Sequence, residues 1–591
     1  MKQFVITVAG VFAGLALFFI GLPILLIAIV AGSAKPAGPP ARTVLALDLR
    51  RNLSDQAAQS PLAVFSGSSH SVLSVIQALH RAETDDRVKG LFIRLPEGGI
   101  APGEADELRL ALKAFRKAGK PVFAHSQGIY ASGASVSAYM LGAASDQFWM
   151  QPSASLQAMG MASDDIFLKR AFDKYGVKAD YQQRYEYKNA VNPYLYDDYT
   201  PAHKEATLSW MGAVYQSELA AAAGDRGKQP DALKATLEAG PYVADDAKAR
   251  GLIDQVGQEH DAEQALLTRA GDGAKLVALD DYHPGARGGY EAKAIAVVGA
   301  EGAIVTGAAG GPGLNQSSDV YSDDVAKAFY DAAKDRRVKA IVFRVSSPGG
   351  SDTASEQILA GVRAAKAAGK PVVVSMGTYA ASGGYWISSQ ATEIVSEPTT
   401  LTGSIGVYGG KFALGDALAR FGVDMRSLSV GGDFADAFGP AQPFTPTQEA
   451  AFSGWMDKIY DGFVQRVAAG RKLTPDRVRQ IAKGRVWTGE QAKGLGLVDR
   501  IGGFYDAVAR AKQLAGIDAG EQVELKILPA RKSALDLVQQ AMGVSAESAR
   551  TMAAAAWVLG DPRAKGLLEE VARARLGVQG STVLAPVPPG F

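Results

Sequence analysis

Residues 379–385 read Tyr-Ala-Ala-Ser-Gly-Gly-Tyr, and residues 348–351, one strand earlier in the chain, read Pro-Gly-Gly-Ser. The pattern predicts a strand ending in the Gly-Gly turn, a helix, a second strand, and then Ser382 at the start of another helix. The glycines let backbone N–H groups approach a substrate carbonyl, and the serine can supply a nucleophile. Together the two stretches predict a parallel α/β layer that could support acyl transfer at the carboxyl ends of its strands.

The elements around these stretches follow from the hydrophobic pattern. Ile341–Val345 and Pro371–Ser375 are typical of buried strands, and the Ala-rich stretch Thr353–Ala368 between them is typical of a helix. Ser382–Ser389 is expected to form the next helix. Two longer helices are expected outside this layer, over Thr445–Arg471 and Thr474–Lys483.

The first half of the chain carries a related copy of this unit. Residues 86–94 (Asp-Arg-Val-Lys-Gly-Leu-Phe-Ile-Arg) match residues 336–344 (Arg-Arg-Val-Lys-Ala-Ile-Val-Phe-Arg), and Ala-Gly-Lys-Pro-Val occurs at both 118–122 and 368–372. The expected organisation is therefore tandem. It consists of an N-terminal anchor at 1–34, copy one at 42–286, copy two at 290–530 and a helical C-terminal extension at 531–591.

Residues 4–31 are almost wholly apolar and carry no charge, which is enough to span a bilayer with some tilt. A cleavable signal sequence is the alternative, because Ala31-Gly32-Ser33-Ala34 resembles a cleavage site. The length of the apolar run favours the uncleaved anchor. Basic residues lie on both sides of it, so charge leaves the orientation open.

Composition narrows the possible functions of the 591 residues. Hydrophobic residues make up 47% and charged residues 21% of the chain, as in a globular protein, and a net charge of +1 gives no reason to expect a nucleic-acid partner. The chain has no cysteine, which excludes disulfides, thiolate metal sites and cysteine nucleophiles. We expect no metal and no cofactor.

Ser382 is the strongest candidate nucleophile. Small neighbours leave room for a substrate backbone, and a helix start brings free N–H groups near a developing oxyanion. The alternative is a serine that only caps a helix in a Gly-rich turn. Gly349 and Gly350 could donate to the oxyanion, or could simply form the sharp turn, which copy one retains as Gly98 and Gly99.

A serine nucleophile needs a base. All six histidines precede copy two and none lies in a recognisable motif. Lys188 lies among aromatic residues in Tyr-Glu-Tyr-Lys-Asn at 185–189, which suits a lysine held neutral by burial. Lowering a lysine pKa from about 10.4 to about 7.5 requires about 4 kcal/mol in favour of the neutral form. An exposed loop lysine is the alternative.

Comparison of the copies favours a composite site. Lys188 falls opposite Phe434, so copy two lacks the lysine. Ser382 falls opposite Val136 or Ser132, depending on which matched segments set the register. The copies have therefore lost complementary parts, although Ala131–Ser135 keeps a partial serine motif that leaves a vestigial second nucleophile open.

These motifs, with Leu-Thr-Gly-Ser-Ile-Gly at 401–406, make the chain similar to the signal peptide peptidase A family in its long two-copy form, over residues 43–525. The resemblance implies tandem Clp-protease/crotonase-like domains. It also implies Ser382 as nucleophile, Lys188 as general base, Ser404 as the hydroxyl that orients the lysine, and Gly350 with Gly383 as oxyanion donors.

The resemblance implies further properties that residue patterns alone do not. They are a homotetramer, remnant signal peptides as hydrophobic substrates, and a single-pass bacterial inner-membrane protein whose catalytic body faces the periplasm. Two alternative functions would not require a nucleophile: that of a non-catalytic membrane scaffold and that of a crotonase-type acyl-CoA enzyme.

Overall fold

The structure is a computed structural model that describes residues 40–56, 71–282, 293–309 and 319–529, apart from residues 52 and 132, together with residues 583–584 and the single positions 7, 10 and 14. The expected anchor, the linker between the copies and the C-terminal extension otherwise lie outside the described residues. Within the described ranges, no helix is both long enough and apolar enough to cross a membrane.

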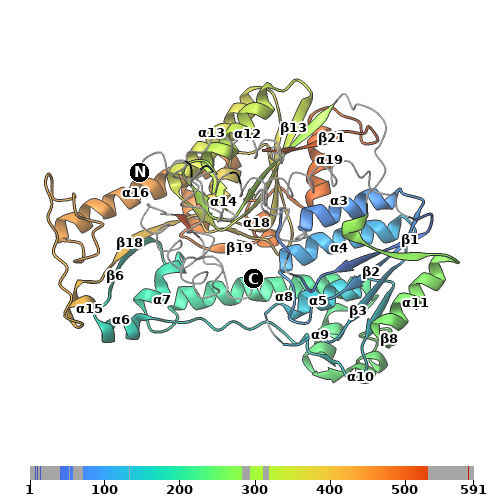
Figure 1. Cartoon of the computed structure of the whole chain (residues 1–591). Coiled ribbons are helices and arrows are strands. Elements are labelled where there is room, and N and C mark those ends of the chain that lie inside the picture. The colour runs from blue at the N-terminus through green and yellow to red at the C-terminus, as the bar shows by residue number, and fades with distance from the viewer. Residues whose placement is uncertain are drawn as a thin grey trace.

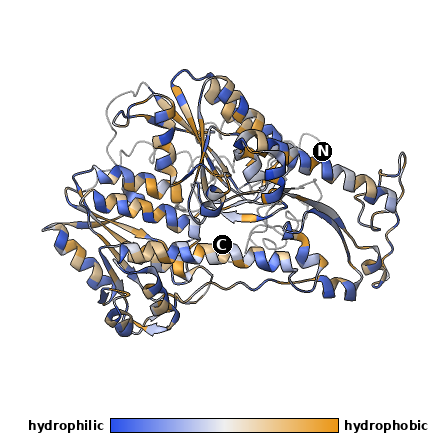
Figure 2. Ribbon diagram, turned by 180° about the vertical axis from the view of Figure 1, so that it is seen from behind, coloured by the Kyte–Doolittle hydropathy of each residue, from blue (hydrophilic) through white to orange (hydrophobic). Residues whose placement is uncertain are grey.

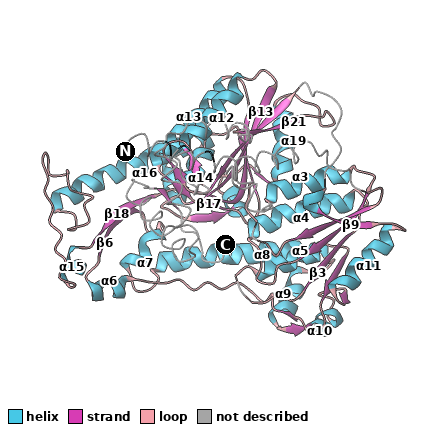
Figure 3. Cartoon of the chain, viewed as in Figure 1, coloured by secondary structure: helices cyan, strands magenta, loops and turns pink. Residues whose placement is uncertain are grey.

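The first half of the chain builds a six-stranded parallel sheet with the strand order β8-β4-β3-β2-β1-β9. Its helices lie on both faces, as expected for alternating strands and helices (Figure 3). The strands are β1 (Thr43–Asp48), β2 (Val88–Arg94), β3 (Val122–Ser126), β4 (Gln147–Met150), β8 (Gln255–Val256) and β9 (Lys275–Ala278). The main helices are α3 (Val72–Glu83), α4 (Pro102–Lys117), α5 (Ser135–Ala143), α8 (Pro201–Asp225), α9 (Pro230–Glu238), α10 (Ala244–Ala249) and α11 (Glu259–Ala270).

The second half builds an eight-stranded sheet with the order β19-β17-β15-β13-β10-β21, to which β16 and β20 add beside β15. All of its pairs are parallel except that of β17 with β19. The strands are β10 (Ala294–Glu301), β13 (Val338–Ser347), β15 (Val372–Ala381), β16 (Glu393–Ser396), β17 (Leu401–Gly403), β19 (Val486–Thr488), β20 (Arg500–Ile501) and β21 (Glu524–Leu528). The helices are α12 (Ser322–Lys334), α13 (Asp352–Ala367), α14 (Gly383–Ser388), α16 (Pro446–Arg471), α17 (Pro475–Ile481), α18 (Gly489–Gly494) and α19 (Phe504–Leu514).

Matching hydrogen bonds in the two halves reveal the duplication and resolve the register around the serine. The Tyr139 hydroxyl donates to the Leu252 carbonyl at 3.2 Å, and the Tyr385 hydroxyl donates to the Leu497 carbonyl at 2.8 Å. Tyr139 therefore corresponds to Tyr385. Counting back three residues from each tyrosine places Val136, inside helix α5, opposite Ser382.

The two halves share an apolar interface. Residues of α19 and one face of the second sheet belong to the same buried cluster as α3, α4 and the first sheet. Gly103 of α4 lies so close to β15 that a Cβ there would meet the Thr378 Cα at 2.9 Å. The covering helices carry both apolar and polar residues, as expected for elements with one buried side (Figure 2).

An antiparallel ribbon joins the halves at a second place, away from both sheets (Figure 1). Strand β6 (Lys178–Arg184) from the first half pairs with β18 (Val407–Ala413) from the second half, from Arg184 opposite Val407 to Lys178 opposite Ala413. The ribbon matters for function because Lys188 follows β6 closely in sequence, and Ser404 shortly precedes β18.

Candidate active site

Ser382 lies between the end of β15 and the start of α14, as the sequence predicted. Its N–H donates to the Gly403 carbonyl at 2.8 Å, and its own carbonyl accepts from the Trp386 N–H at 2.8 Å, which begins the helix. The backbone is in an unusual conformation, with φ 56° and ψ −116°. Non-glycine residues seldom adopt positive φ, and such strain clusters at functional sites. The turn holds the side chain, which is fully buried, toward Lys188.

Lys188 lies beside Ser382 although the two residues come from different halves of the chain. The Lys188 Nζ is 2.7 Å from the Ser382 Oγ, 2.9 Å from the Ser404 Oγ and 3.0 Å from the Ser404 carbonyl oxygen. A neutral lysine amine has two N–H donors and one lone pair. It can therefore donate to both Ser404 oxygens while its lone pair accepts the Ser382 O–H.

Burial holds the pKa of Lys188 well below its usual value of 10.5. The residue has no exposed surface, and within the described part of the chain its Nζ is hydrogen-bonded to serine oxygens but to no carboxylate. Removal of the ammonium from water without a counter-ion favours the neutral amine. This environment, rather than an exposed loop, is the one that a general base requires.

The turn after α17 fixes the position of Lys188, and sequence analysis did not identify it. The Lys483 carbonyl accepts from the Tyr185 and Tyr187 N–H groups at 3.2 Å each. Gly484 has φ +84°, and a Cβ there would lie 2.4 Å from the Lys188 Cβ. A glycine between a helix and a strand is a turn signal, but the sequence does not reveal which loop packs against it.

Gly350 and Gly383 lie against each other beside Ser382. A Cβ on Gly383 would meet the Gly350 nitrogen at 2.9 Å and the Ser355 Oγ at 2.9 Å. A Cβ on Gly350 would meet the Ile304 carbonyl oxygen at 2.1 Å. Both positions therefore require glycine. The absence of side chains there would also let backbone N–H groups approach a substrate carbonyl closely.

The structure describes less of the degraded motif in copy one. Val136, the counterpart of Ser382, is a buried helical residue, and Phe434, the predicted counterpart of Lys188, is 41% exposed. Ser132 lies outside the described residues.

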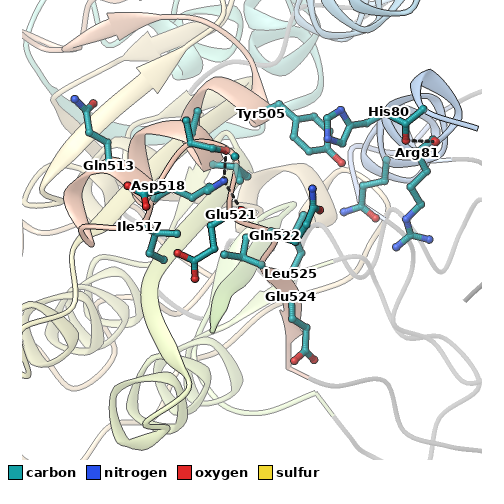
Figure 4. A pocket seen from close by; sticks show the side chains of 18 of the residues that line it. His80, Arg81, Tyr505, Gln513, Ile517, Asp518, Glu521, Gln522, Glu524 and Leu525 are labelled. Carbon is teal, nitrogen blue, oxygen red and sulfur yellow. Dashed lines mark hydrogen bonds between the residues drawn. The ribbon is translucent and has the colours of Figure 1, made fainter. Parts of the chain in front are cut away.

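A large cavity of about 1540 Å³ lies away from the Ser382–Lys188 pair, between α3 and the segment from α19 to β21. The rings of His80 and Tyr505 pack against each other in its lining, with their centroids 4.0 Å apart (Figure 4). Neither Ser382 nor Lys188 lines it. The candidate chemistry therefore depends on the geometry of the buried pair and not on this cavity.

Comparison with known proteins identifies the family. The sequence model of Peptidase family S49 matches residues 114–271 and 364–518, one segment in each half. The chain is also 35% identical to Protease 4 of Salmonella typhi over 490 residues, which are 80% of this chain and 76% of that protein. The chain belongs to Peptidase family S49. This S49 member is a serine peptidase, as its sequence predicted.

Two further relatives agree with the S49 assignment. Protease 4 of Haemophilus influenzae is 32% identical over 530 residues, which are 84% of this chain and 83% of that protein. The chloroplastic serine protease SPPA of Arabidopsis thaliana is 28% identical over 541 residues, 90% of this chain and 76% of that protein. The similarity extends across both halves of the S49 chain, in agreement with the predicted long form.

Proposed function

We propose that this chain is a membrane-anchored endopeptidase that degrades remnant signal peptides, with Ser382 as nucleophile and Lys188 as general base. The observation that carries the dyad is the 2.7 Å separation between the Lys188 Nζ and the Ser382 Oγ in a fully buried setting. The S49 relatives support the proteolytic activity.

In the proposed reaction, neutral Lys188 accepts the Ser382 hydroxyl proton as the oxygen attacks the peptide carbonyl. The N–H groups of Gly350 and Gly383 stabilise the oxyanion, and loss of one such donor typically costs about 3 kcal/mol. The lysine then gives its proton to the leaving amine. A water molecule, deprotonated by the same amine, hydrolyses the acyl-enzyme and restores the Ser382 hydroxyl.

Ser404 is proposed to orient the base. Its hydroxyl and carbonyl oxygens both lie within hydrogen-bonding distance of the Lys188 Nζ, so they hold the amine while its lone pair faces Ser382. Ser404 has φ 49° and is fully buried, and its hydroxyl oxygen accepts a hydrogen bond from the Lys188 Nζ. The mechanism requires neither metal nor cofactor.

The finer features of the proposal rest on family resemblance and on the N-terminal sequence. They are tandem Clp-protease/crotonase-like domains, a single-pass anchor within residues 4–31, a periplasmic catalytic body at the bacterial inner membrane, and a homotetramer. The uncharged apolar anchor would keep the enzyme in the same bilayer as its hydrophobic substrates.

Separate Ser382→Ala and Lys188→Ala variants test the dyad on a hydrophobic peptide. Each variant should lower kcat by at least about 10³-fold, because the nucleophile and base act as a unit. The parent enzyme's kcat/KM should rise with pH through the lowered Lys188 pKa, since only the neutral amine accepts the proton.

Ser145→Ala and Lys120→Met are matched controls, because among the described residues these side chains donate their hydrogen bonds to backbone carbonyls of copy one, away from Ser382. Near-parent cleavage by either dyad variant would overturn the assignment. A fluorophosphonate probe that labels Ser382 would also separate a peptidase from a non-catalytic scaffold or an acyl-CoA enzyme.

A further inference from the structure

The Arg485 side chain lies beside the loop that carries Lys188. Its guanidinium carbon is 4.9 Å from the centroid of the Tyr187 ring and 4.3 Å from that of the Trp487 ring, so the cation contacts two aromatic side chains. Its Nη1 and Nη2 atoms donate to the two carboxylate oxygens of Glu205, in helix α8, at 2.8 and 2.7 Å. Stacking and a bidentate ion pair both fix the orientation of a guanidinium, so this side chain is held in one place.

The two rings that contact this guanidinium belong to opposite sides of the proposed dyad. Tyr187 directly precedes Lys188 in the chain. Trp487, in β19, packs against Gly403, where an added Cβ would meet the Trp487 Cδ1 at 2.9 Å. The Gly403 carbonyl accepts the Ser382 N–H at 2.8 Å. The guanidinium therefore connects the loop of the base with the strand that holds the nucleophile.

The main chain around Arg485 also holds Ser404. The Arg485 carbonyl accepts from the Ser404 N–H at 2.7 Å, and the Gly484 N–H donates to the Ile405 carbonyl at 2.8 Å. Both oxygens of Ser404 accept in turn from the Lys188 Nζ. Arg485 thus reaches the lysine in two ways, through the residue that precedes it in the chain and through the serine that holds its amine.

The position of this loop matters because burial alone lowers the pKa of Lys188. Charged groups on the neighbouring turn, on α8, on α16 and at the end of β6 pair with one another, and the other titratable groups beside the loop are tyrosines. The pairs are Arg485–Glu205, Lys483–Glu186 and Arg184–Asp457, and the tyrosines are Tyr185, Tyr187 and Tyr460. A loop that opened would admit water to the amine and return its pKa toward the usual 10.5.

We propose that Arg485 is a positioning residue for the general base, which holds the Lys188 loop against β19 and α8 so that the amine stays shielded from water and directed at Ser382. This inference rests on the proposed function, because it requires Lys188 to be the base. Arg485 acts through Lys188 and not on the substrate. Its substitution should therefore change kcat and the pH profile and leave KM unchanged.

Arg485→Met and Tyr187→Leu test the proposal with a hydrophobic peptide. Each should lower kcat about tenfold with KM unchanged, because the base is displaced from the nucleophile. Each should also move the rising limb of the kcat/KM profile upward by about one pH unit, because a hydrated amine is harder to deprotonate. A smaller fraction of folded enzyme would not produce this shift. The double variant should resemble either single variant, because both changes break one contact.

Further variants separate the contact from charge and from folding. Tyr187→Leu keeps the Arg485 cation, so equal shifts in both single variants exclude loss of a charge as their cause. Tyr187→Phe keeps the aromatic face and should retain the parent kcat and pH profile. If Arg485→Met failed to fold, Glu205→Gln, which alters a half-exposed carboxylate, should show a smaller shift in the same direction. Lys483→Met is the matched control, because it breaks only the exposed ion pair with Glu186 between the same two segments.

A parent-like pH profile in both Arg485→Met and Tyr187→Leu would overturn the proposal, whatever their melting temperatures. A raised KM at unchanged kcat would also overturn it, because that result would place Arg485 on the substrate. The Lys188→Ala variant distinguishes this failure from failure of the proposed function. Near-parent cleavage by Lys188→Ala would overturn the dyad, whereas its loss of cleavage beside a parent-like profile in Arg485→Met and Tyr187→Leu would overturn the positioning role alone.

Discussion

At the scale of single residues, Gly383 directly follows the proposed nucleophile Ser382 and packs against the Gly349–Gly350 backbone. A Gly383→Ala substitution would place a methyl group 2.9 Å from the Gly350 nitrogen and 3.0 Å from the Gly349 Cα. Both contacts are with backbone, so the two proposed oxyanion donors must separate. We expect kcat for peptide hydrolysis to fall by about 10²-fold or more, while the fold is kept.

Gly454→Ala is the control for this substitution. Gly454 lies within α16, where an added Cβ would meet nothing within 4 Å. The change should leave kcat unaltered and stabilise the helix by about 0.5–1 kcal/mol. Equal kcat values for the Gly383→Ala variant and the parent would remove Gly383 from the oxyanion site.

The sequence predicted the candidate site residues better than it predicted the residues that hold them in place. Ser382 and Lys188 were singled out because small residues flank the serine and aromatic residues flank the lysine, and comparison of the copies paired them. Gly484, by contrast, contacts Lys188 across a large sequence separation. A residue pattern reports local backbone preferences, and it does not report which distant loop packs against a turn.

At the scale of elements, strand β13 carries an ion cluster that joins the two halves. Arg344 is 1% exposed, and its guanidinium bonds to Asp55 and to the Glu107 carboxylate at 2.8 Å. Both carboxylates come from the first half of the chain. An Arg344→Met substitution leaves them buried without their cation, which should destabilise the protein by about 3–5 kcal/mol in thermal or urea unfolding.

Arg363→Met provides the comparison, because Arg363 forms its ion pair with Glu356 at the surface and is 41% exposed. We expect a change of at most about 1 kcal/mol there. If both substitutions had the same small effect on unfolding, the cluster would not hold the halves together.

Hydrophobic pattern predicted the elements themselves well. The expected strand at 341–345 lies inside β13, the expected strand at 371–375 covers only the start of β15, which continues to Ala381, and the expected helix at 353–368 is α13 within one residue at each end. The pairing of β6 with β18 could not be predicted, because a short two-stranded ribbon between halves depends on tertiary contacts rather than on local periodicity. The ion pairs of Arg344 with Asp55 and Glu107 could not be predicted for the same reason.

At the scale of the whole molecule, the interface between the halves should respond to pH. Burial raises the pKa of Glu104 to about 8, of Glu301 to about 7 and of Asp106 to about 6, and it raises the pKa of Glu397 well above the usual 4.5. Acids with raised pKa values bind more protons when folded than when unfolded. Their stabilisation is present at low pH and is lost as pH rises through the folded values.

These four acids should therefore lower the melting temperature between about pH 5 and pH 8, whereas burial lowers the pKa values of Lys188, His125 and His203, which act in the opposite direction. Glu397→Gln keeps the neutral form of one carboxyl group and should flatten this decline, with a higher melting temperature than the parent at pH 8. Glu490→Gln, at an exposed position, should follow the parent curve. The expectation would be contradicted if the melting temperature of Glu397→Gln, measured by differential scanning calorimetry, showed no increasing advantage over that of the parent from pH 5 to pH 8.

The strained turn at Ser382 has a consequence for the history of the duplicated chain. A non-glycine residue held at φ 56° makes the fold less stable by about 1–3 kcal/mol than a relaxed backbone would be. Selection for folding alone would therefore not retain this conformation at Ser382. The corresponding position of copy one, Val136, lies in a regular helix, which is the outcome expected where that pressure was released. The strained backbone at Ser382 and the relaxed backbone at Val136 thus differ as the proposed division of roles between the two copies requires.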